Sequence, residues 1–164
     1  MMINHMELEA IETAITIENR SLCFYRAVLS KVSDSNARRV FELLLEEEKQ
    51  HLNQLCDLYQ GSKEKLDAIL NKDSLCEDPF YCALSDSIDS DSLEIDALEV
   101  ALREEQACVR NYSRFVETIR EPSIHDMFSR ILCETRNHCE MIEDEYMRLM
   151  HMVDRTDQET YVRE

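Results

Sequence analysis

Charged and polar side chains interrupt apolar stripes that otherwise follow helical spacing. Glu18 lies three residues after Ile15, so both point to the same side of a helix. Glu48 and His51 are also three residues apart and share one helical face inside another apolar stripe. Further polar positions on such stripes are Glu105, Thr135 and His138. The spacing therefore predicts that carboxylates and imidazoles gather in the interior of a helical protein.

These buried groups need a positive partner. An unpaired carboxylate inside a protein costs several kcal/mol, and Lys and Arg are scarce at the inward positions. A divalent metal cation would supply the missing charge, since carboxylate oxygens and imidazole nitrogens are common metal ligands. The alternative is that these residues mark the surface edges of helices and that the histidines are only hydrogen-bonded. The recurrence of the pattern on several stripes favours the metal site.

An internal repeat relates these positions to one another. A shift of 87 residues aligns the two halves of the chain without a gap. The aligned pairs include Ala10 with Ala97, Glu12 with Glu99, Ala14 with Ala101, Glu18 with Glu105, Tyr25 with Tyr112, Phe41 with Phe128, Leu45 with Leu132, Glu47 with Glu134, His51 with His138, and Tyr59 with Tyr146. Chance would not readily align the rarer His and Tyr residues in this way. The chain therefore reads as two similar helical hairpins.

The composition also favours helices. The chain has 164 residues with one Gly and two Pro, too few turn formers for a many-stranded sheet. Apolar stripes run from Ile11 to Leu29, from Phe41 to Leu58, from Leu98 to Ile119 and from Phe128 to Leu149. We predict an all-α fold, an antiparallel four-helix bundle that forms a single domain over residues 1–164.

The ends and connections of the helices can also be placed. The sequence Ser33-Asp34-Ser35 offers N-cap residues for the second helix, and Pro122 suits the first turn of the fourth. Residues from about 61 to 90 form a long crossover between the hairpins, in which we expect a short helix from Lys63 to Asn71. Residues from about 153 to 164 form a polar C-terminal tail.

The charge and the cysteines restrict the partners and the compartment. A formal net charge of −17 argues against nucleic acid and anionic membrane as partners. The sequence has no apolar run of about 18 residues and no basic, then apolar, leader at its N-terminus, so a cytoplasmic protein is expected. The seven cysteines include no C-x-x-C pair, which argues against a zinc ribbon, a rubredoxin-like knuckle or a disulfide framework.

The sequence resembles the rubrerythrin branch of the ferritin-like superfamily. The first half carries Ala10-Ile11-x-x-Ala14-Ile15-x-x-Glu18, then Phe24-Tyr25, then Phe41-x-x-Leu44-Leu45-x-Glu47-Glu48-x-x-His51. The second half echoes it with Ala97-Leu98-x-x-Ala101-Leu102-x-x-Glu105 and Tyr112. The resemblance covers nearly the whole bundle. It implies a ferritin-like bundle with a di-iron carboxylate site, for which manganese or zinc are alternatives.

The resemblance also implies a role for each residue of the site. Glu18 and Glu105 would be single carboxylate ligands, Glu48 a carboxylate bridging two metals, and His51 and His138 the histidine ligands. Tyr25 and Tyr112 would orient the carboxylates or, alternatively, serve as ordinary core aromatics.

The chain departs from the family pattern at Thr135, where a second bridging Glu is expected. Three carboxylates then face the four positive charges of two ferrous ions. Water or hydroxide would fill the gap, or the nearby Glu134 would substitute, or only one metal would be held firmly. An asymmetric, weakened site is expected.

The resemblance to rubrerythrins implies reduction of peroxide or oxygen, or oxidation of ferrous iron, in defence against oxidative stress. Electrons would come from an external donor such as a rubredoxin or a reductase, and similar proteins commonly form homodimers. The competing interpretation, favoured by Thr135, is a non-catalytic metal-binding or helical interaction module with a partly degenerate site. A purely structural bundle is a third alternative.

Overall fold

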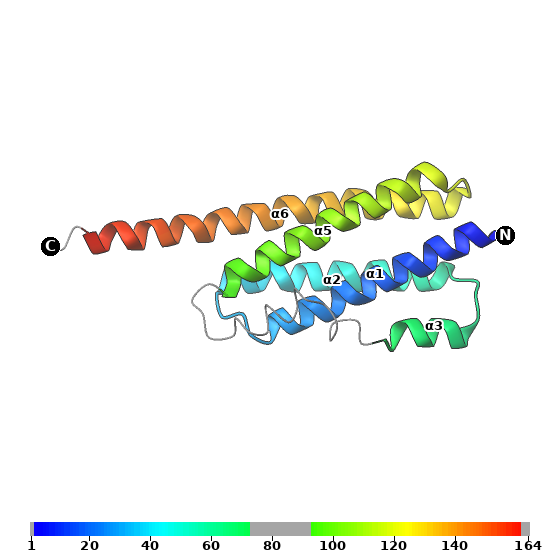
Figure 1. Cartoon of the computed structure of the whole chain (residues 1–164), viewed down its shortest axis with the longest axis horizontal. Helices are drawn as coiled ribbons and strands as arrows, with labels where there is room; N and C mark the ends of the chain where they lie inside the picture. Colours follow the sequence, from blue (N-terminus) through cyan, green and yellow to red (C-terminus); the bar gives the residue numbers. More distant parts are fainter. Residues whose placement is uncertain (1, 73–92, 162–164) are drawn as a thin grey trace.

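The computed structural model describes the backbone of residues 2–72 and 93–161, and side chains in these segments up to residue 151. Every element within these ranges is helical: α1 His5–Leu29, α2 Ser35–Leu58, α3 Lys63–Leu70, α5 Leu93–Thr118 and α6 Pro122–Tyr161. The helices α1 and α2 form one antiparallel hairpin, and α5 and α6 form a second (Figure 1). The predicted ferritin-like bundle of two similar hairpins is confirmed.

Polar caps set the beginnings of the helices. Asn4 caps α1 in a capping box in which its side chain accepts from Glu7 N while the Glu7 carboxylate accepts from Asn4 N. Asp34, one of the predicted N-cap residues, accepts from the backbone N–H groups of Asn36 and Ala37 at the start of α2. The short crossover helix, expected from Lys63 to Asn71, is α3, whose N-cap is Ser62.

The structure describes only part of the predicted crossover, but it describes the backbone of most of the predicted C-terminal tail. The remainder of the predicted crossover, from residue 73 to 90, lies outside the described residues. The segment predicted as a polar tail is helical through Tyr161, as the last part of α6. In Figure 1, α6 is the longest helix and runs past the others at its C-terminal end. None of the described helices is both long and apolar enough to cross a membrane.

The two hairpins pack with α1 against α5 and α2 against α6. Their buried apolar residues form two separate clusters. One cluster includes Phe24, Val28, Phe41, Leu44, Leu98 and Ile142. The other includes Ile11, Ile15, Leu55, Phe128, Ile131 and Leu132. Along each long helix, the residues of these two clusters lie on either side of one short polar stretch, so a polar layer separates two apolar halves of the core.

Candidate metal centre

The polar layer contains all five residues that the sequence predicted as metal ligands. The side chains come from all four long helices: Glu18 from α1, Glu48 and His51 from α2, Glu105 from α5, and His138 from α6. Each residue is at most 3% exposed. Buried carboxylates at this density are typical of metal or catalytic sites, because each one needs a compensating positive charge.

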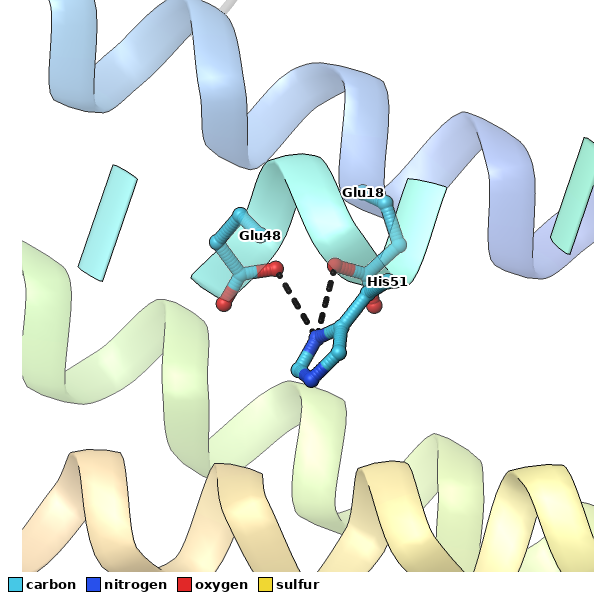
Figure 2. Close-up of side chains that lie close together, drawn as sticks. All are labelled: Glu18, Glu48 and His51. Atoms are coloured by element: carbon cyan, nitrogen blue, oxygen red, sulfur yellow. Dashed lines mark ion pairs between the residues drawn. The ribbon is translucent and has the colours of Figure 1, made fainter. Parts of the chain in front are cut away.

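The five residues form two groups that share one carboxylate. Glu18, Glu48 and His51 make the first group, and Glu48, Glu105 and His138 make the second; within each group the candidate ligand atoms lie within 4.8 Å of one another. In the first, His51 Nδ1 lies 3.5 Å from Glu18 Oε2 and 3.6 Å from Glu48 Oε2 (Figure 2).

In the second group, His138 Nδ1 lies 3.2 Å from Glu48 Oε1 and 3.4 Å from Glu105 Oε2. The two oxygens of Glu48 thus face one histidine each. This is the arrangement that a carboxylate bridging two cations requires.

The first group contains two buried atoms without a partner. Glu18 Oε2 and His51 Nδ1 have no hydrogen-bond partner among the described residues. A buried polar atom left unpaired costs about 1 to 3 kcal/mol, and both atoms face the space between the group's side chains. A carboxylate oxygen and an imidazole nitrogen are suitable ligands for a divalent cation, so the residues fit a metal at this position.

The pKa values show how these groups share charge. Burial, followed by the charge of Glu48, raises the pKa of Glu18 to about 8. Burial lowers the pKa of each histidine, but the close contacts with the neighbouring carboxylates outweigh it and raise the pKa of His51 and of His138 to about 11. Protons on the imidazoles therefore balance the carboxylates, and a bound cation would displace them.

Two tyrosines hold the outer carboxylates of the centre. Tyr25 on α1 donates a 2.5 Å hydrogen bond to Glu105 Oε1 on α5, and Tyr112 on α5 donates a short one to Glu18 Oε1 on α1. Both tyrosines are fully buried. Burial, and then the nearby carboxylate charge, raises their pKa well above the usual value, which keeps both hydroxyls protonated as donors. The two bonds are equivalent under the repeat and tie the hairpins together.

Removing the hydroxyl of Tyr112 should therefore destabilise the protein. In Tyr112→Phe, Glu18 Oε1 loses its donor in a buried environment, and we expect the free energy of unfolding of the metal-free protein to fall by about 1 to 3 kcal/mol. Urea denaturation with a chelator present measures this loss. Tyr146→Phe is the matched control, since Tyr146 donates to Glu99 on the surface and its loss should matter little. Equal effects of the two changes would contradict a role for Tyr112 in holding Glu18.

Thr135 occupies the position where a fourth carboxylate was expected. It is buried, with 2% exposure, as its place on the apolar stripe predicted. Its hydroxyl donates a 2.8 Å hydrogen bond to Ile131 O, one turn earlier in α6. Thr135 belongs to neither of the two groups that could hold a metal. The described centre thus contains three inward carboxylates rather than four.

Glu134, the suggested substitute for the missing ligand, lies on the outer side of the centre. Its Oε2 is 2.5 Å from His51 Nε2, the ring nitrogen other than the one that faces Glu18 and Glu48. Its side chain is 43% exposed. It belongs to neither candidate metal group among the described residues.

Glu47 makes the equivalent contact on the other histidine, which the sequence analysis did not anticipate. Glu47 Oε2 lies 2.5 Å from His138 Nε2, and the side chain is 36% exposed. The repeat pairs Glu47 with Glu134. This pairing is the one feature of the sequence that indicates a shared role for the two residues. Both lie toward the surface of their helices, where a glutamate does not by itself indicate a contact with the centre.

A comparison with known protein families gives a match over most of the chain. A family model described as rubrerythrin matches residues 9–146, which run from the second turn of α1 into α6 and include every residue of the centre. Searches of curated proteins and of solved structures found no match.

Proposed function

Because this chain belongs to the rubrerythrin family, we propose that it binds two iron ions in the polar layer and acts as an oxidoreductase. Its substrate would be peroxide or oxygen, or ferrous iron that it oxidises, in defence against oxidative stress. The observation that supports this most is the pair of buried Glu/His groups that share Glu48. The residues offer oxygen and nitrogen ligands, which suit iron or manganese better than a structural zinc site.

The proposed ligands of the two ions come from all four long helices. Glu18 and His51 would hold one ion and Glu105 and His138 the other, with Glu48 bridging both. Two ferrous ions at these positions would supply the two electrons that reduction of peroxide to water requires.

Residues around the centre hold its ligands in orientation and shield it from water. Tyr25 and Tyr112 hold Glu105 and Glu18 in orientation, so these carboxylates need little rearrangement when a cation binds. The two apolar clusters, which include Phe41 on one side and Phe128 on the other, exclude water from above and below the layer. A dry surrounding strengthens the attraction between the carboxylates and a cation.

Sustained turnover would need electrons from outside the chain. We propose an external donor such as a rubredoxin or a reductase, acting in the reducing cytoplasm, and a homodimer as the functional unit. These partners follow from the family resemblance. The acidic charge of −17 would favour a docking partner with a basic surface.

A rapid-mixing experiment tests the proposed activity. The protein is loaded with ferrous iron without oxygen and mixed with hydrogen peroxide while the absorbance is followed. We expect a fast change equivalent to two electrons per chain, and repeated turnover when a reductant and rubredoxin are added. Bovine serum albumin with the same amount of iron serves as the control. Two bound ions that react no faster than iron in the control would rule out the peroxidase.

The second candidate function is a non-catalytic metal-binding module, and Thr135 favours it. The bundle lacks a fourth inward carboxylate among the described residues, so three negative charges would face the four positive charges of two ferrous ions. Such a centre would hold its second ion weakly. Binding of iron without oxidation in the rapid-mixing experiment would support this module, and absence of bound metal would support neither candidate.

A further inference from the structure

Two partly exposed glutamates contact the buried histidines at Nε2, the ring nitrogen that faces away from the inward carboxylates. Glu134 on α6 reaches His51 on α2, and Glu47 on α2 reaches His138 on α6, each with 2.5 Å between a carboxylate oxygen and Nε2. We infer that Glu47 and Glu134 are positioning residues, each of which fixes the metal-binding nitrogen of the histidine on the opposite helix. This inference rests on the proposed metal centre.

The chemistry of the contact decides which ring nitrogen can bind a metal. An ionised carboxylate only accepts hydrogen bonds, so the Nε2 atom beside it must carry a proton and donate. In a neutral imidazole the other nitrogen, Nδ1, then has the free lone pair. In both histidines Nδ1 is the atom that faces the inward carboxylates. The outer glutamates therefore select the nitrogen that points into the centre.

The contacts are reciprocal because of how each helix is built. Glu47 precedes His51 by four residues on α2, and Glu134 precedes His138 by four residues on α6. Each helix thus supplies one histidine and one glutamate that holds the other helix's histidine. A rotation or slide of α2 against α6 would break both contacts together. This pair of contacts therefore couples the register of α2 against α6 to the orientation of both imidazoles.

The position of Glu134 favours this role over that of a substitute ligand. A ligand in place of the missing carboxylate would have to reach the space between Glu48 and the Nδ1 atoms of the two histidines. The carboxylate of Glu134 lies instead on the far side of the His51 ring and is 43% exposed. Carboxylates that hold the outer nitrogen of a metal-bound histidine typically contribute about 10- to 100-fold to metal affinity.

The test replaces each glutamate separately and uses zinc as a diamagnetic probe. Zinc affinity of Glu134→Gln and Glu47→Gln is measured by titration calorimetry, and nitrogen-15 spectra of the imidazoles show which histidine binds at each zinc ratio. We expect Glu134→Gln to weaken zinc binding at His51 by about 10- to 100-fold while His138 is affected less, and Glu47→Gln to do the reverse. Glu140→Gln, an exposed change on α6, is the matched control.

The outcomes separate this inference from the proposed function. If the parent binds zinc and both variants bind it equally well at both histidines, the positioning role is wrong and the metal centre stands. If Glu134→Gln weakens zinc binding at both histidines as much as Glu48→Gln does, Glu134 is a ligand and the inference is overturned. If the parent binds neither zinc nor iron, the metal centre and the positioning role both fall. Circular dichroism of each variant without metal shows whether the helices are intact.

Discussion

Replacing Glu48 with glutamine is expected to remove both metal ions together. Glu48 is the single carboxylate shared by the two candidate groups, and its two oxygens face His51 and His138 separately. An amide of the same size carries no charge and offers one oxygen in place of two. We expect the affinity for both ions to fall by more than the about 10- to 100-fold that loss of an outer partner costs.

Iron analysis after anaerobic loading and desalting measures this effect. The parent should retain up to two ions per chain and Glu48→Gln close to none, whereas Glu18→Gln should lose mainly the ion of its own group. Glu46→Gln serves as the control, because Glu46 lies two residues away on the exposed side of α2. A Glu48→Gln variant that keeps one ion at the affinity of the parent would show that Glu48 does not bridge.

The second large effect is expected from Thr135→Glu, with opposite signs for the two forms of the protein. Thr135 is buried on the inward stripe of α6, equivalent under the repeat to Glu48. In the metal-free protein the protonated imidazoles already balance the other carboxylates, so a fourth carboxylate there would have no positive charge left to compensate it. An uncompensated buried charge costs about 3 to 5 kcal/mol. With two divalent ions bound, four carboxylates would balance four positive charges, and we expect more iron to be retained.

Thermal denaturation with chelator and with excess metal measures both signs. Thr135→Gln is the matched control, since it adds the same volume without the charge and separates overpacking from electrostatics. The Glu variant should melt below the Gln variant without metal and regain or exceed the parent's stability with metal. If Thr135→Glu retains no more iron than the parent, the missing carboxylate is not what limits metal binding.

The sequence was sufficient to predict the bundle because its signals are local and mutually consistent. Apolar stripes of helical period gave the four long helices, and the repeat gave their pairing into hairpins. The length of α6 follows from the same evidence: no Gly or Pro occurs after Pro122, so nothing in the sequence breaks the helix before Tyr161. The predicted polar tail was identified by composition, which does not determine whether a segment is helical.

The inward residues of the centre could also be predicted, whereas their outer partners could not. Glu18 and His51 can be identified from the sequence because they interrupt apolar stripes. Glu47 and Glu134 lie on partly exposed faces, where glutamate is the ordinary residue of a helix. Their contacts depend on the distance and angle between α2 and α6, which one-dimensional spacing does not contain. The tyrosines fall between these cases, since their burial could be predicted but not the hairpin to which each would donate.

The 87-residue repeat has a consequence for the number of carboxylates that the centre can hold. Two separate copies of one hairpin, related by a twofold axis, would carry the same residue at both equivalent positions and would always contribute carboxylates in pairs. Covalent fusion of the halves lifts that restriction, because position 48 can remain Glu while position 135 becomes Thr. A single chain with two fused halves can therefore carry three inward carboxylates, whereas a symmetric assembly of identical halves can carry only an even number.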